Sequence, residues 1–256
     1  MKDSIISIIR KNRIQKMIVA IIWIVIWIVI SNHLNNELFL PGPRKVVLTL
    51  QSMIKTKNFW ISILYSTYKI GMGFLLGLCL GLIFGGVASK IHLLRLFLSP
   101  MISIIKTIPV ASFIILILVW VNSKQLSTCI SFLVTFPMIY IAVLEGYDHV
   151  NQQLLEMVKV YKVKPITQLR YLYLSEIHPF VISSAKVAVG LSWKAGISGE
   201  IIGLPTKSIG EQLYLSKLYL DISQLFAWTV VIVIICYVFE KIMLGLLYLI
   251  QEKLLT

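Results

Sequence analysis

Long blocks of apolar residues, separated by short polar stretches, constrain this chain more than any other feature. The blocks cover about residues 14–30, 68–87, 104–121, 127–144, 182–201 and 225–250. Each is close to the length of about 20 residues that a helix needs to cross a bilayer. The chain is 58% hydrophobic and only 14% charged, whereas soluble domains carry about 25% charged residues. We therefore predict an all-α membrane protein with six transmembrane helices, forming a single domain over residues 1–256.

Basic residues are distributed unevenly between the polar stretches. With six spans both termini lie on one side, where the chain carries 13 lysines and arginines against seven on the other side. Because cytoplasmic loops collect basic residues, we predict a bacterial plasma membrane protein with both termini in the cytoplasm. The first block resembles a signal peptide, but no small-x-small cleavage site follows Ile30, so we expect an uncleaved helix.

The net charge of +13 has two explanations. Anionic membrane surfaces attract basic loops, and nucleic acids attract basic domains. Since no soluble-looking basic domain stands out in the sequence, we favour the membrane and exclude nucleic acid as a partner.

Residue patterns that carry enzymatic or metal chemistry are missing from the sequence. Cys79, Cys129 and Cys236 lie in apolar blocks and lack metal-ligand spacing. There is no phosphate-binding glycine loop and no catalytic pair on one helix face. We therefore expect no enzyme activity and no bound cofactor or metal. Uphill transport would need an ion gradient or a separate subunit.

Glycines recur every four residues in the second block, at Gly73, Gly77, Gly81 and Gly85. This spacing places them on one face of a helix, where the absence of side chains lets another helix approach closely. We favour packing within the chain as their role. A dimer contact or a moving gate helix is the alternative.

Prolines interrupt the start of the third block. Pro100 and Pro109 enclose the run MISIIKTI, and each removes a helical hydrogen bond. We expect a bent or re-entrant approach to the third span at this place.

The fifth block holds the ionisable residues that lie deepest in a predicted span. Lys186, Trp193 and Glu200 are seven residues apart. Gly190 shares their helix face, whereas Lys194 lies about 80° away. Charges within spans are costly and usually face a bundle interior or a water-filled path, so one interpretation is a translocation pathway along this face. The alternative is that Lys186 reaches the cytoplasmic interface and Glu200 ends the helix at the outer one.

A polar segment from Glu145 to Pro179 separates the fourth block from the fifth, and the predicted topology places it in the cytoplasm. Two apolar stripes at helical spacing run through it: Leu154, Leu155, Val158 and Tyr161, then Ile166, Leu169, Leu172 and Tyr173. Pro165 disfavours helical geometry at Lys164, which predicts a turn between two short helices. Such amphipathic helices either dock into an apolar groove of a partner or lie on the membrane surface.

This polar segment resembles the EAA loop of binding-protein-dependent ABC transporter permeases, and Glu156 matches the glutamate of that motif. Other parts of the chain resemble the sulfonate, nitrate and taurine class of these importers. They are the LPGP run at 40–43, Pro100 with Pro109, the AKVAVG run around Lys186, and Trp193 followed by GEIIG at 199–203. The resemblance extends from about Phe39 to Ile250.

The resemblance implies a MetI-like permease fold with two short cytoplasmic coupling helices. The chain would be the membrane subunit of a type I ABC importer, passing a small polar or anionic organic solute by alternating access. Its partners would be a cytoplasmic ATPase subunit, which binds ATP and Mg²⁺, an external solute-binding protein and a second permease copy. The ATPase would contact Glu156, Leu155, Val158, Tyr161, Lys162 and Pro165. A stand-alone secondary transporter or channel is the alternative.

The loop departs from the family motif at several positions. Met157 and Val158 replace its two alanines, Lys162 stands in place of a glycine, and Ser175 stands in place of a proline. We expect the loop to differ in shape from its relatives at Lys162 and Ser175.

Overall fold

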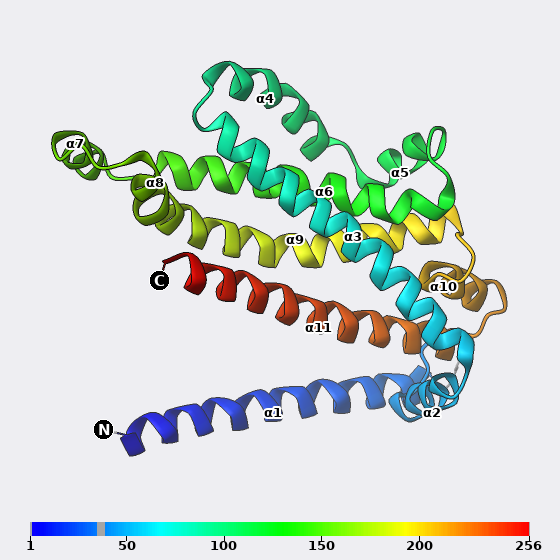
Figure 1. Ribbon diagram of the computed structural model, residues 1–256. Coiled ribbons are helices and arrows are strands. Elements are labelled where there is room, and N and C mark those ends of the chain that lie inside the picture. Colours follow the sequence, from blue (N-terminus) through cyan, green and yellow to red (C-terminus); the bar gives the residue numbers. More distant parts are fainter. Residues whose placement is uncertain (1, 35–38, 256) are drawn as a thin grey trace. The chain divides into compact units, whose positions relative to one another are not determined.

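In the computed structural model, which describes residues 2–34 and 39–255, every regular element is a helix (Figure 1). The all-α prediction is therefore confirmed for this part of the chain. The chain divides into two compact units. The first comprises Met1–Phe59 and Leu213–Val230, and the second comprises Trp60–Gln212 and Val231–Thr256.

The first unit contains α1 (Lys2–Leu34), α2 (Pro43–Ile54) and the adjoining parts of α10 (Ile209–Leu218) and α11 (Ile222–Leu255). The indole N–H of Trp27 donates to the Pro41 carbonyl at 3.2 Å, and its ring lies 6.0 Å from that of Phe226. Pro43 begins α2, because proline has the backbone angle of a first helical turn and lacks the N–H that would be unpaired there. This short helix is not among the predicted elements.

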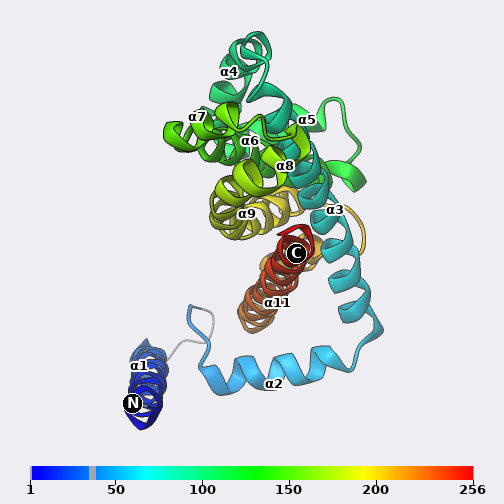
Figure 2. The ribbon, with the colours of Figure 1, turned by 60° about the vertical axis from the view of Figure 1, so that its left-hand side comes forward.

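The second unit is built on the part of α3 (Lys57–Ala88) from Trp60 onward, on α6 (Ser123–Asp148) and on α9 (Leu174–Gly203). Helices α6 and α9 lie side by side over most of their lengths (Figure 1 and Figure 2). The part of α11 that belongs to this unit contacts both α3 and α9 through one aromatic ring, described below.

Phe239 of α11 joins three helices of the second unit. Its ring lies 5.6 Å from that of Phe74 on α3 and 5.9 Å from that of Trp193 on α9, both edge to face. Aromatic pairs prefer this geometry because the edge of one ring is positive and the face of the other is negative. Phe74 and Trp193 are buried at this contact, whereas Phe239 is half-buried and much of the apolar surface of α11 is exposed.

The four regularly spaced glycines of α3 face α6. A Cβ atom added at Gly77, Gly81 or Gly85 would lie 2.7–2.8 Å from a side-chain carbon of α6. At Gly73 it would meet the Thr128 carbonyl oxygen. Only glycine therefore lets α3 approach α6 this closely, and the repeat serves packing between two helices of one chain.

Helices α4 (His92–Thr107) and α5 (Val110–Leu118) form a bent pair, with 106° between them. Ile108 is extended, with φ −69° and ψ 130°, as expected for a residue that precedes a proline. The predicted bend is thus confirmed at Pro109, whereas Pro100 lies inside α4. We call the turn at Ile108 and Pro109 the elbow.

Within the described residues, five helices are long and apolar enough to cross a membrane, and the bent pair would make a sixth. The predicted number of six therefore holds only if the bent pair is one span, and the predicted boundaries differ from those of the helices. Helix α3 begins at Lys57 rather than at about residue 68. Its first turns carry Ser62 and Ser66, which lower the local hydropathy although both are buried.

The polar segment between α6 and α9 is shorter than predicted, since α6 continues to Asp148. It contains α7 (Gln152–Val160), α8 (Pro165–Gln168) and a π-helical turn, η1 (Leu169–Tyr173). Because α8, η1 and α9 are continuous, the second predicted coupling helix is not separate but forms the first turns of one long helix. Serine rather than proline at position 175 permits this, since proline would remove a backbone N–H there.

Candidate functional site

The segment between α6 and α9 has a small apolar core of its own. Val150, Val158 and Leu172 are buried together, and Leu155 and Tyr173 pack against them. Burial of these side chains supplies a stabilisation that an isolated helix as short as α7 lacks. The segment therefore has a defined shape without a partner.

Both ends of α7 are capped. At its start the side chain of Asn151 accepts a hydrogen bond from a backbone N–H of the first turn at 2.8 Å. At its end the N–H of Lys162 donates to the carbonyl of Lys159 at 3.2 Å, and that of Val163 to the carbonyl of Val158 at 3.1 Å. These two bonds form a Schellman motif, which satisfies carbonyl groups that the helix leaves unpaired.

The Schellman motif requires a left-handed backbone at Lys162, whose φ is 49°. Glycine is the usual residue at this position of the motif, because a side chain there is strained. The sequence departs from the family glycine at Lys162, yet the backbone adopts the conformation that a glycine takes freely. The lysine itself is exposed.

The outer side of α7, the turn after it and the start of α8 present apolar side chains to solvent. Val160 and Tyr161 are 77% and 75% exposed, and Met157 and Ile166 are also exposed. We call these four residues the loop face. Glu156 is exposed next to Met157.

The predicted docking residues divide into two groups. Glu156, Tyr161, Lys162 and Pro165 are exposed, whereas Val158 is buried and Leu155 is half-buried in the core of the loop. The interpretation of Leu155 and Val158 as a docking stripe is therefore corrected. A helix with two apolar sides can bury only one of them internally, and here that side contains these two residues.

Two contacts fix the base of the loop to the long helices. The guanidinium of Arg95 on α4 donates to both carboxylate oxygens of Asp148 at 3.1 and 2.6 Å. The rings of Tyr147 and Tyr173 stack 4.9 Å apart at an angle of 6°. A Cβ added at Gly146 would lie 2.6 Å from the backbone of α9, so α6 and α9 meet closely at this point.

The residues of the predicted translocation face do not form one exposed strip. Lys186 and Gly190 are exposed, but Trp193 is 1% exposed and Glu200 is 0% exposed. The regular spacing did place them along one side of α9, but neighbouring helices cover that side toward its C-terminal end. Trp193 and Glu200 are therefore interior residues, and Gly190 and Trp193 line a second cavity with residues of α11. The translocation pathway itself stays a prediction.

Glu200 belongs to a buried polar cluster that joins α3, α9 and the start of α10. Its Oε2 accepts hydrogen bonds from the hydroxyl of Ser66 at 2.6 Å and from the N–H of Gly210 at 3.1 Å. The hydroxyl oxygen of Ser66 accepts from the N–H of Ile209 at 2.9 Å. The first N–H groups of a helix lack internal partners and carry partial positive charge, so the carboxylate stabilises the start of α10.

This cluster shows what the sequence interpretation missed. One interpretation placed Glu200 at the outer end of the helix, and it does lie three residues before the end of α9, but its side chain is fully buried, which neither interpretation predicted. Ser66, its partner from 134 positions away, was not predicted. No spacing rule links residues so distant, and the only local signal was polar residues at the edge of an apolar block.

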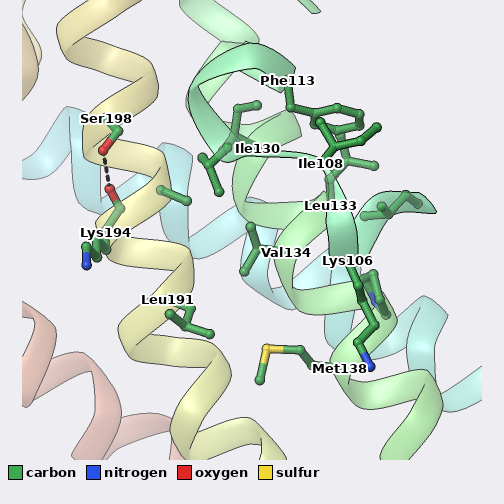
Figure 3. Close-up of a pocket in the computed structure, with 14 residues that line it drawn as sticks. Lys106, Ile108, Phe113, Ile130, Leu133, Val134, Met138, Leu191, Lys194 and Ser198 are labelled. Atoms are coloured by element: carbon green, nitrogen blue, oxygen red, sulfur yellow. Dashed lines mark hydrogen bonds between the residues drawn. The ribbon is translucent and has the colours of Figure 1, made fainter. Parts of the chain in front are cut away.

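A cavity of about 480 Å³ lies beside the elbow, between α6 and α9 (Figure 3). Of the 14 residues that line it, only Lys106, Lys194 and Ser198 are polar. None of the three was predicted as a site residue. The wall on α9 that faces this cavity differs from the face that contains Trp193 and Glu200.

Metal chemistry has no visible centre in the part of the chain that the structure describes. No group of three or more His, Cys, Asp or Glu side chains there could hold a metal ion. The three cysteines are free thiols.

Comparisons with known proteins agree with the sequence resemblance. Residues 77–256 match the family described as binding-protein-dependent transport system inner membrane component. A protein of Bacillus subtilis named as an aliphatic sulfonates transport permease, SsuC, is 24% identical over 197 residues, covering 77% of this chain and 71% of that protein. The nitrate import permease protein NrtB of Synechococcus elongatus is 26% identical over 174 residues, covering 64% of this chain and 62% of that protein. A protein of Brucella melitensis named as an ABC transporter permease is 22% identical over 194 residues, covering 75% of this chain and 78% of that protein.

Proposed function

Because this chain belongs to the binding-protein-dependent transport system inner membrane components, we propose that it imports a small polar or anionic organic solute by alternating access. As a family member it is the permease subunit of an ABC importer and a multi-pass inner membrane protein without ATPase activity or a cofactor of its own. ATPase and solute-binding subunits are the general partners of such permeases. We take residues 1–256 as one permease domain with both termini in the cytoplasm.

The loop between α6 and α9 is the proposed docking element for the ATPase subunit. The single observation that carries this assignment is the loop face, four exposed apolar residues on a segment whose own core is already complete. Helix α7, which carries part of this face, lies beyond the ends of α6 and α9 (Figure 1). A short helix with an exposed apolar side fits the groove of a partner protein.

Helix continuity gives this loop a way to act on the pathway. Since α8, η1 and α9 form one unbroken helix, a displacement of the loop by the ATPase also displaces α9. Helix α9 supplies Leu191, Lys194 and Ser198 to the cavity beside the elbow. Closure of two ATPase subunits would thereby change the shape of the membrane pathway.

Co-purification of the permease with its ATPase tests the docking site. The variants Glu156→Lys and Tyr161→Ala should reduce recovery of the ATPase, because both alter exposed residues of the loop without touching its core. The matched control is Lys124→Glu, which reverses the charge of an exposed residue at the other end of α6. Full recovery of the ATPase with both loop variants would contradict the assignment.

The same proposal assigns two further partners to the chain. A second copy of this chain would form the other half of the pathway, and residues 208–221 would meet the external binding protein. The named functions of the relatives, aliphatic sulfonates transport and nitrate import, support an anionic solute.

Lys186 is exposed on α9, so Lys186→Met should reduce uptake while the ATPase complex still assembles. Unchanged uptake would remove Lys186 from the pathway.

A further inference from the structure

We propose that Glu240 of α11 and Lys194 of α9 form an ion pair in the middle of the membrane when the cavity between the two helices closes, and that this pair is a gate. The inference rests on the proposed function, because a gate is part of alternating access. It goes further in assigning a role to Glu240, which belongs to none of the sequence patterns.

The cavity between α9 and α11 contains one charge of each sign. It has a volume of about 460 Å³, and ten described residues of the second unit line it. Among these ten, Lys194 is the one cation and Glu240 is the one anion. The others are uncharged, as are Ile197 on α9 and Val233 on α11. Within this lining, each charge therefore has the other as its only possible ion-pair partner.

A ring contact places the two charges at similar depth. The Trp193 ring lies 5.9 Å from the Phe239 ring, and these two residues directly precede Lys194 and Glu240 in the chain. Helix α9 and the part of α11 in the second unit run in opposite directions (Figure 1). With a rise of 1.5 Å per residue, one step along each helix from this contact separates the charges by only about 3 Å along the helix axes.

Both charges lie near the middle of the membrane. Lys194 is nine residues before the end of the candidate span at Gly203, and Glu240 is nine residues before the end of the candidate span at Leu249. Because the helices are antiparallel, these ends lie on opposite sides. Nine residues of helix measure about 14 Å, close to half of the hydrocarbon thickness of about 30 Å. Charges at this depth are costly and normally face water or a partner of opposite charge.

The two charges are apart in this structure. In the part of the chain that the structure describes, neither Lys194 nor Glu240 forms an ion pair. The Lys194 side chain extends from α9 away from α6 (Figure 3). Lys186 and Lys241, the nearest other cations along the two helices, do not line the cavity, and the Lys241 ammonium lies 5.3 Å from the centre of the Tyr237 ring. Lys194 is therefore the partner that the cavity offers to Glu240.

A movement of α9 toward α11 would bring the charges together. Opposite charges attract more strongly when water leaves the space between them, because the effective dielectric constant falls. Pairing would offset part of the cost of removing each charge from water, and the closed cavity would exclude other ions. Since α8, η1 and α9 form one helix, the loop that we assign to the ATPase is directly connected to this gate.

A carbodiimide crosslink tests the pair in the full chain, held in lipid nanodiscs without the ATPase. Dicyclohexylcarbodiimide enters membranes and activates carboxyl groups. A lysine amine in contact then forms an amide bond with the carboxyl carbon, and the reagent takes up the water that is removed and leaves as a urea.

Peptide mass spectrometry should find Glu240 joined to Lys194 at about ten times the yield of Glu240 joined to Lys186 or Lys241, or more, because the amide forms only at contact distance. The control Lys194→Arg keeps the positive charge but cannot form this amide, so the product should disappear. The crosslink itself needs no variant, so the test does not depend on how a variant folds.

Three results would overturn the pair: Glu240 modified by the reagent but joined to no lysine, Glu240 joined equally to Lys186, and Glu240 left unmodified. A second measurement tests the gate. In the complex with the ATPase, the crosslinked fraction should differ about threefold or more between the nucleotide-free and the vanadate-trapped state. Equal fractions would make the pair a fixed contact and would overturn its role as a gate. If no ATPase binds the loop, the proposed function fails, whereas the crosslink in the permease alone still decides whether the pair forms.

Discussion

The Glu200 carboxylate accepts a hydrogen bond from the Ser66 hydroxyl at 2.6 Å, and neither side chain has exposed surface. This bond joins α3 to α9 at the point where α10 begins. A buried carboxylate without partners would destabilise the protein by several kcal/mol. Hydrogen bonds from Ser66 and Gly210 compensate for that penalty, and they hold the start of α10 against α9.

Ser66→Ala should lower the free energy of unfolding by about 1–3 kcal/mol, because it removes a donor to Glu200 and an acceptor for the Ile209 N–H at once. Thermal unfolding of the purified protein in detergent would measure the change. Ser183→Ala, at an exposed position of α9, is the matched control and should change stability by less than about 0.5 kcal/mol. Equal effects of the two variants would show that the buried hydrogen bonds contribute little.

Gly210→Ala should separate α10 from α9. The added methyl group would meet the Cβ of Glu200 and would lie 2.6 Å from the backbone nitrogen of Ile201. Neither atom can move without moving α9, so we expect a loss of about 1–3 kcal/mol. Gly245→Ala on α11, where no atom outside the helix's own nearby backbone lies within 4 Å of the added carbon, should be neutral or stabilising by up to about 1 kcal/mol.

A stable Gly210→Ala protein would mean that α10 can adopt another position at little cost. Disulfide crosslinking between cysteines introduced in α9 and in the first turn of α10 would then test whether the helix had moved. If the variant crosslinks as fast as the protein with Gly210 and is equally stable, the close approach of α10 to α9 at this glycine would be contradicted.

Lys162→Gly should stabilise the loop by about 1 kcal/mol, because lysine at φ 49° is strained and glycine is not. Hydrogen exchange of the Val163 amide, which closes the Schellman motif, would report this as slower exchange. Lys159→Gly, inside α7, should have the opposite effect, since glycine in a helix interior costs about 1 kcal/mol. Faster exchange in both variants would show that Lys162 makes a stabilising contact that outweighs its strain.

The Arg95–Asp148 pair should contribute little by itself. The two side chains are 39% and 47% exposed, and such pairs are worth about 0–1 kcal/mol. A double-mutant cycle with Arg95→Met and Asp148→Asn should therefore give a coupling energy within this range, falling as salt is raised. A coupling well above that range, or one insensitive to salt, would mean that the pair is shielded by a partner that covers the base of the loop.

The membrane helices were predictable because they depend on local composition. Runs of apolar residues near the length of a bilayer predicted five long apolar helices and the bent pair, and the proline at position 109 predicted the elbow. The glycine spacing likewise predicted a bare face on α3. Each of these features consists of residues that are close together in the sequence. It can therefore be recognised without knowing which element packs against it.

The candidate site was less predictable because it depends on distant residues. The heptad spacing of Lys186, Trp193 and Glu200 suggested one functional face, but burial divides it. Likewise, helical spacing made Leu155 and Val158 look like docking residues, whereas the loop uses them for its own core. Periodicity shows that a side is apolar and does not show which element covers it.

Composition and periodicity thus established an all-helical membrane protein, the bend at Pro109 and a structured polar loop, since these follow from interactions over a few turns of helix. The tertiary packing established which polar groups are buried and which face a cavity. Glu200 meets Ser66 across 134 residues, and Lys106 and Lys194 border one cavity from different helices. Such pairings depend on how helices distant in sequence pack together, and no local pattern records that arrangement.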